Sequence, residues 1–109
     1  MIRHCVFVKF RSGVSRDERA DIYAGLNALV GQIDGLLKAE FGPNISPEGQ
    51  NKGFNDGFIM DLADEAARDR YLAHPAHQAA GARLVAALEG GVEGLMVFDM
   101  EVEDAANRQ

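Results

Sequence analysis

Hydrophobic and polar residues alternate with a period of two in four segments of the chain. Alternation of this kind is typical of β-strands, whose side chains point to opposite faces in turn. The predicted strands cover residues 2–10, 36–41, 54–62 and 95–102. In the first of them, positions on both faces are apolar, so we expect both faces of the sheet to be at least partly buried.

Two other segments carry apolar residues at helical spacing. The first begins with a capping box, Ser-Arg-Asp-Glu at residues 15–18, and its apolar stripe continues until Gly35. The second begins at Asp64, breaks at His74-Pro75 because proline interrupts a helix, and resumes until the glycines at 90 and 91. The sequence therefore predicts two helices, with a break inside the second.

The predicted order is β-α-β-β-α-β, which is that of a ferredoxin-like α+β fold. In this fold an antiparallel four-stranded sheet carries both helices on one face. The other face would be left uncovered although it has apolar residues, and such a surface is usually covered by another chain. We therefore expect a homodimer in which two sheets pack face to face about a two-fold axis. The turn-rich segment 42–53 is expected to be a long surface loop, either a plain connector or a lid.

The length and the net charge of the chain limit the number of domains and the partners that we expect. The 109 residues suffice for one domain, placed at 1–103, with a polar tail at 104–109. A net charge of −6 argues against nucleic acid as a partner, because nucleic-acid-binding proteins gather Lys and Arg on one face. No apolar run reaches membrane-spanning length and no secretion signal is recognisable, so we expect a cytoplasmic protein without membrane contact. The single cysteine, Cys5, is interpreted as a buried thiol.

The densest group of chemically active residues contains Tyr71 and two of the three histidines. Pro75 disfavours helical backbone at His74 and suits the first position of a new helix, so His74 is expected to cap that helix. His77 then lies in the first turn and continues the apolar stripe, with the small residue Gly81 one turn further on. Because the helix dipole disfavours a protonated imidazole there, we expect a neutral His77 that points inward beside Tyr71.

Two further polar residues are expected at the same place. His4 comes from the first strand and Asp56 from the third, and we expect these strands to be parallel neighbours with both residues near their starting ends. A carboxylate beside an imidazole orients the ring and raises its basicity. Each histidine could instead be a structural residue hydrogen-bonded to the backbone. A metal site on His74 and His77 is a weaker alternative, since the helix break disturbs their alignment and a closed zinc site needs more ligands.

Several motifs together resemble one protein family. They are Ile2-Arg3-His4, Gly42-Pro43-Asn44 followed by Ser46-Pro47-Glu48-Gly49, Tyr71-x-x-His74-Pro75-x-His77 and Val97-Phe98-Asp99. With these motifs, and over nearly its whole length, the chain is similar to the stress-responsive A/B barrel domain, or Dabb. The resemblance implies a dimeric α+β barrel built from ferredoxin-like subunits, in agreement with the predicted order of elements. Most members of this family have no assigned reaction.

The resemblance also implies roles for individual residues. A plant polyketide cyclase of this family carries out an aldol condensation without a cofactor, with a histidine and a tyrosine that match His77 and Tyr71. A further pocket histidine of that enzyme matches His4. Where the enzyme has a histidine in its third strand, this chain has Asp56.

Two functions are compatible with these residues. The first is a dimer that binds a small, partly apolar or polyketide-like ligand, with contacts from His4, Asp56, His74 and Gly81. The second is a lyase or cyclase in which His77 removes an acidic C–H proton while Tyr71 stabilises the enolate oxygen. Neither function is expected to require a metal or a cofactor.

Overall fold

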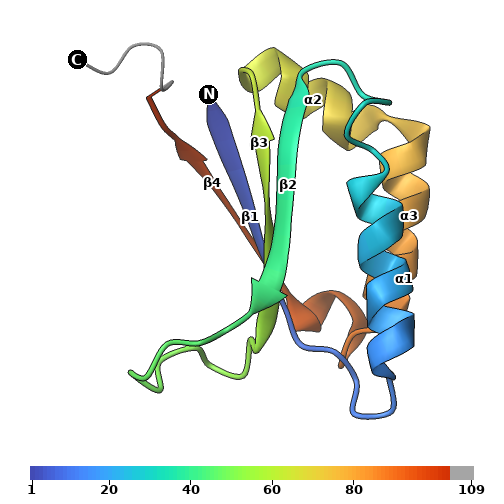
Figure 1. Ribbon diagram of the computed structural model, residues 1–109, viewed down its shortest axis with the longest axis vertical. Helices are drawn as coiled ribbons and strands as arrows, with labels where there is room; N and C mark the ends of the chain where they lie inside the picture. Colours follow the sequence, from blue (N-terminus) through green and yellow to red (C-terminus); the bar gives the residue numbers. More distant parts are fainter. Residues whose placement is uncertain (104–109) are drawn as a thin grey trace.

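The computed structural model describes residues 1–103. Its elements follow one another as β1 (Ile2–Val8), α1 (Arg16–Asn27), β2 (Leu36–Pro43), β3 (Asp56–Leu62), α2 (Glu65–Ala73), α3 (Pro75–Ala86), the 3-10 turn η1 (Gly91–Gly94) and β4 (Leu95–Glu101). Figure 1 shows the four strands side by side, with α1, α2 and α3 on one side of the sheet. The predicted ferredoxin-like α+β fold is confirmed. The tail predicted at 104–109 lies outside the described residues.

Neighbouring strands are antiparallel throughout the sheet, in the order β2-β3-β1-β4. The prediction that the first and third strands run parallel is wrong. The α1 crossover returns the chain parallel to β1 in β2, and the β2–β3 hairpin then reverses it before it pairs with β1. His4 consequently lies opposite Met60 of β3 and Asp99 of β4, whereas Asp56 lies opposite Val8 at the far end of β1.

The core lies between the sheet and the helices. β1, β2 and β3 contribute buried apolar side chains from the helix-facing side of the sheet, β4 contributes the partly buried Leu95, and the helices contribute one apolar stripe each. The buried members are Ile2, Val6, Val8, Val14, Ile22, Leu26, Leu29, Ile33, Leu36, Phe58, Met60, Leu62, Ala67, Tyr71, Leu84, Ala87 and Leu88. Removal of this apolar surface from water is the main force that holds the helices to the sheet.

Side chains cap the starts of α1 and α2. Ser15 Oγ accepts a hydrogen bond from the Glu18 N–H at 3.0 Å, and Asp64 Oδ1 accepts one from the Ala67 N–H at 2.8 Å. Each cap satisfies a backbone donor that has no partner within its helix. Among residues 1–103, no helix is long and apolar enough to cross a membrane.

The first helix ends earlier than the pattern predicts. α1 ends at Asn27 rather than near Gly35, and the segment after it is a series of turns. Gly31 has a φ of 95°, a left-handed conformation that an α-helix does not contain. Leu29 and Ile33 nevertheless lie in the core. Turns of three to four residues keep the helical spacing of apolar positions, so periodicity alone did not reveal where the helix stops.

The connection between β2 and β3, which we call the β2–β3 arm (residues 44–55), is long and extends past the end of the sheet. Figure 1 shows it on the side away from the helices. Its base is closed by a hydrogen bond from the Asn44 N–H to the Asn55 carbonyl at 2.8 Å. Ile45, close to this base, is 89% exposed, so its apolar side chain has almost no contact within the described chain.

No helix covers the face of the sheet opposite α1, α2 and α3, which we call the open face (Figure 1). Four large apolar side chains with relative exposures of 36–55% belong to it: Phe7, Met96, Phe98 and Met100. Cys5 lies on the same side of β1 but is only 8% exposed, which confirms the prediction of a buried thiol. A contiguous apolar surface on a sheet is typical of an interface with another chain.

Candidate functional site

The backbone between α2 and α3 breaks at His74 and Pro75, as predicted. His74 is extended, with φ −71° and ψ 130°, and Pro75 is the first residue of α3. His74 Nδ1 accepts a hydrogen bond from the Ala76 N–H at 3.0 Å, so this imidazole caps α3. The break places His77 in the first turn of α3.

Tyr71, from the last turn of α2, and His77 lie against each other. Their ring centroids are 4.1 Å apart with an interplanar angle of 40°. Tyr71 is 1% exposed, whereas His77 is half-buried. A Cβ added to Gly81 would lie 3.8 Å from His77 Nε2, so Gly81 borders the same imidazole one turn along α3. The two rings therefore meet at the junction of the helices, as the sequence predicts.

His4 approaches Tyr71 from the sheet. The two ring centroids are 5.6 Å apart at an interplanar angle of 68°, an edge-to-face contact. His4 is 5% exposed, and its Nδ1 lies 2.6 Å from Asp99 Oδ1. Because an ionised carboxylate can only accept, Nδ1 of His4 is the donor in this bond, and Nε2 is left for other contacts. The structure thus brings three of the predicted site residues, His4, Tyr71 and His77, into one cluster.

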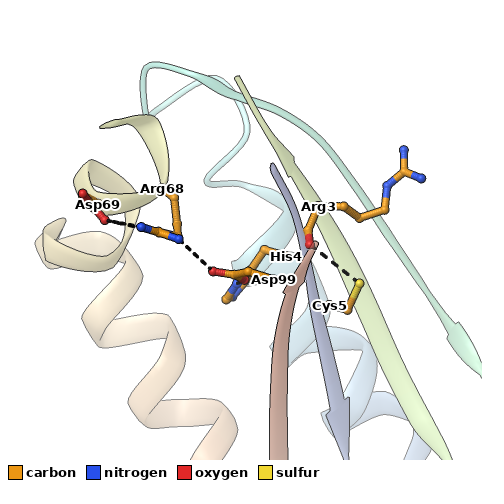
Figure 2. A network of polar contacts seen from close by, with 6 residues as sticks. All are labelled: Arg3, His4, Cys5, Arg68, Asp69 and Asp99. Carbon is orange, nitrogen blue, oxygen red and sulfur yellow. Dashed lines mark hydrogen bonds and ion pairs between the residues drawn. The ribbon is translucent and has the colours of Figure 1, made fainter. Parts of the chain in front are cut away.

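A chain of polar contacts continues from His4 to the surface. Figure 2 shows Arg68 of α2 between Asp69 and Asp99, with Asp99 next to His4. Arg68 Nη1 lies 3.4 Å from Asp99 Oδ2, and Arg68 Nη2 lies 3.1 Å from Asp69 Oδ1. The hydrogen bond with Asp69, followed by the negative charges around it, raises the pKa of Arg68. Asp99 therefore has a cation on one side and the buried imidazole on the other.

Burial sets the protonation of the two stacked rings. Burial lowers the pKa of His77. A hydrogen bond with the Leu72 backbone acts in the opposite direction, and the charges of His4 and His74 lower the pKa further. Burial also raises the pKa of Tyr71. At neutral pH the cluster therefore contains a neutral imidazole beside a protonated phenol. His77 Nδ1 is buried and makes no hydrogen bond of good geometry with any residue in 1–103. A neutral imidazole has one ring nitrogen without a hydrogen, which can accept a proton or a hydrogen bond from a ligand.

Asp56 does not face this cluster. It lies at the start of β3, beside Val8 at the far end of β1. Its Oδ2 is 3.8 Å from Arg19 Nη1 of α1. The expected position depended on a parallel β1 and β3, and the antiparallel pairing moves Asp56 to the other end. Asp99 takes the place beside His4 that we expected Asp56 to have.

The rings of Tyr71, His77 and His4 line none of three cavities at the surface of residues 1–103, which have volumes of about 740, 520 and 310 Å³. The cavity of about 740 Å³ lies between the β2–β3 arm and the open face. Within residues 1–103, no group of three or more His, Cys, Asp or Glu side chains is arranged to hold a metal ion. Of the three rings, that of His77 is the most exposed to solvent.

Known proteins are similar to this chain in sequence and in fold. The family model of the stress responsive A/B barrel domain, Dabb, matches residues 2–102. An uncharacterized protein of Streptomyces coelicolor, SCO4036, is 45% identical over 82 residues, which are 72% of this chain and 81% of the relative. The stress-response A/B barrel domain-containing protein HS1 of Arabidopsis thaliana is 28% identical over 76 residues, or 70% of each chain.

A solved structure agrees with these sequence relatives. A dimeric ferredoxin-like protein of unknown function from Jannaschia sp. CCS1 is 34% identical, with a TM-score of 0.85 over 93% of this chain and 98% of that chain. The structure is that of a small ferredoxin-like domain with a cluster of histidine and tyrosine rings at a helix junction. The chain belongs to the stress-responsive A/B barrel domain family.

Proposed function

We propose that this protein is a homodimer that binds a small, partly apolar ligand at Tyr71, His77 and His4, with no reaction assigned. The observation that carries the proposal is the buried Nδ1 of His77, which has no hydrogen-bond partner of good geometry in residues 1–103. Buried polar atoms almost always have a hydrogen-bond partner. An atom without one therefore indicates a place where water or a ligand supplies the partner. Gly81 lies next to the other ring nitrogen, Nε2, and leaves room there for a ligand group, and His74 is close enough for its charge to lower the pKa of His77.

The dimer is supported by the open face and by the relatives. Phe7, Met96, Phe98 and Met100 would otherwise remain in contact with water. The solved relative from Jannaschia is described as dimeric. In the proposed dimer two open faces meet, and each β2–β3 arm extends over the partner sheet. Such an assembly forms the closed α+β barrel expected for the family, and we propose a cytoplasmic location for it.

Sedimentation of two lysine variants tests the dimer. Phe98→Lys places a charge on the open face, and we expect a monomer at low micromolar concentration because a buried, unpaired charge is costly. Val92→Lys is the matched control, since Val92 is 66% exposed in η1, outside the open face. We expect that control to sediment like the unchanged protein. A monomeric unchanged protein would contradict the dimer, and equal behaviour of the two variants would contradict an interface on the open face.

A second candidate function is a cofactor-independent lyase or cyclase. It is favoured by the neutral His77 in contact with the protonated phenol of Tyr71. His77 would take an acidic C–H proton from a substrate bound beside it, and the Tyr71 hydroxyl would donate to the developing enolate oxygen. Asp99 would hold the His4 imidazole in one orientation through its Nδ1.

His77→Ala separates the two candidates. If the protein is an enzyme, turnover of a β-keto acid or a polyketide-like thioester should fall by about 10²- to 10⁴-fold while the melting temperature changes little. If it is a binding protein, the unchanged chain gives no turnover, but the ligand raises its melting temperature and the variant loses that increase. Gln78→Ala, at an exposed position of the same helix, is the control. A loss of several kcal/mol of stability on His77→Ala would show a structural role and contradict both candidates.

A further inference from the structure

The oxidisable sulfur atoms of the chain are concentrated on one surface. The sequence contains four methionines and one cysteine. Met96 and Met100 of β4 are 45% and 46% exposed, whereas Met60 of β3 is 0% exposed and lies in the core. Because Met96 and Met100 are four residues apart on one strand, both side chains point to the same side of the sheet, the open face. Two exposed thioethers therefore lie on the surface to which we assign the dimer interface.

The register of the sheet places these methionines on either side of an aromatic ring. The pairing of β1 with β4 sets three cross-strand pairs on the open face: Met96 with Phe7, Phe98 with Cys5, and Met100 with Arg3. Phe98 is 55% exposed, the highest value among the four large apolar side chains of this face. Within residues 1–103, β4 is an edge strand that pairs with β1 alone. A second copy that covers Phe98 would therefore cover both thioethers as well.

Oxidation to the sulfoxide changes what this surface can bury. A methionine thioether is apolar and adapts to the shape of its partner, whereas the sulfoxide oxygen is polar and needs a hydrogen-bond donor when it is buried. Opposite Met96, the phenyl ring of Phe7 offers no such donor. Opposite Met100 lies Arg3, which donates to Asp61 from Nε at 2.9 Å and from Nη2 at 3.4 Å and has further N–H groups. Oxidation of Met96 is therefore the more disruptive of the two.

Cys5 is the alternative oxidation site on the open face, and its surroundings protect it. The residue is 8% exposed, and its thiol donates to the Arg3 carbonyl at 3.8 Å (Figure 2). Burial is the largest influence on the Cys5 thiol and raises its pKa. Peroxide reacts with the thiolate rather than with the thiol. We therefore expect the exposed methionines to be oxidised before Cys5.

We propose that Met96 and Met100 form a peroxide-sensitive modification site that controls the homodimer. This inference rests on the proposed dimer, in which two open faces meet. Hydrogen peroxide reaches both thioethers in the monomer. Each sulfur gains one oxygen atom as the O–O bond breaks and water leaves, so the sulfur is oxidised and the peroxide is reduced. The sulfoxides then oppose reassociation, and the modified chains remain monomeric.

Peroxide treatment followed by sedimentation tests the inference. We expect the dissociation constant of the dimer to rise by about tenfold to 100-fold, the effect of a buried polar group without a partner. Mass spectrometry should locate the added oxygen on Met96 and Met100 and not on Met60. Oxidation should be slower at high protein concentration, where the dimer protects both residues. Methionine sulfoxide reductases that act on both sulfoxide epimers should restore the dimer.

Substitutions separate these two methionines from the other sulfur atoms. Leucine resembles methionine in volume and has no sulfur to oxidise, so the double variant Met96→Leu/Met100→Leu should remain a dimer after peroxide treatment. Met96→Gln imitates the polar sulfoxide and should weaken the dimer without peroxide. Met100→Gln should weaken it less, because Arg3 can donate to the new side chain. Leu72→Gln, at a 44% exposed position of α2, is the matched control and should not change the dimer.

Three results would overturn the inference. Peroxide could dissociate the double leucine variant as it does the unchanged protein, which would assign the effect to another residue. The dimer could persist after both methionines are oxidised, or Met96→Gln could behave like Leu72→Gln. Each of these results leaves the dimer itself intact. An unchanged protein that is monomeric before peroxide is added would instead contradict the dimer and this inference together.

Discussion

The hydrogen bond between His4 and Asp99 gives a quantitative prediction for stability. His4 is 5% exposed, and its Nδ1–H has Asp99 as acceptor at 2.6 Å. Asp99→Ala removes the acceptor and leaves the buried donor unpaired, which costs about 1–3 kcal/mol. Asp99→Asn keeps an oxygen acceptor and should cost less. When His4 is replaced by Phe, no buried donor remains to be left unpaired. Asp99→Ala should then have little effect on the free energy of unfolding.

Urea unfolding of the four proteins in this double-mutant cycle measures the coupling. The free energies of unfolding should give a coupling of about 1–2 kcal/mol between positions 4 and 99. All four proteins must be measured at one concentration, because a dimer gains stability by mass action. Arg68→Gln is the control, since Arg68 contacts Asp99 from the solvent side at 3.4 Å. A coupling below about 0.5 kcal/mol, the usual deviation for independent sites, would refute the view that Asp99 holds His4.

Two further predictions concern protonation and backbone conformation. The pKa of His77 is lowered from its ordinary value of 6.5, so the unfolded chain binds more protons below that pH. The stability of the unchanged protein relative to His77→Ala should therefore be constant above about pH 6.5 and decrease as the pH falls below it. A difference independent of pH in urea unfolding would exclude a neutral, buried His77. Gly35→Ala should lose about 1–3 kcal/mol, because Gly35 has φ +90° and an added Cβ would lie 2.5 Å from Ala67 Cβ. Gly25→Ala, where an added Cβ meets nothing within 4 Å, should instead gain about 0.5–1 kcal/mol. Equal melting temperatures of the two variants would contradict this explanation.

Local patterns predicted most of the fold. Alternation located the four strands, the capping box at Ser15 and the apolar spacing from Asp64 onward located the starts of the helices, and Pro75 located the break. These signals depend on residues that are near one another in sequence, so each can be interpreted without knowledge of the tertiary structure. The position of the Tyr71–His77 contact followed from the same local reasoning.

Features that depend on strand pairing were predicted less well. Asp99 bonds to His4 across 95 residues, and only the register of β1 with β4 brings them together. An available signal was the pair of acidic residues, Asp99 and Glu101, on the helix-facing side of β4. The same dependence explains the misplaced Asp56, since the direction of β3 relative to β1 decides which end of the sheet it occupies.

The break at His74 and Pro75 has a geometric consequence for the stacked rings. On an uninterrupted α-helix, six residues advance about 9 Å and about 600° around the axis, which would leave Tyr71 and His77 about 120° apart. Their centroids are 4.1 Å apart because the chain changes direction between them. Grafting the two residues onto a straight helix would therefore not reproduce the contact. Any hinge motion between α2 and α3 would change the ring separation directly, while His4 stays fixed to the sheet.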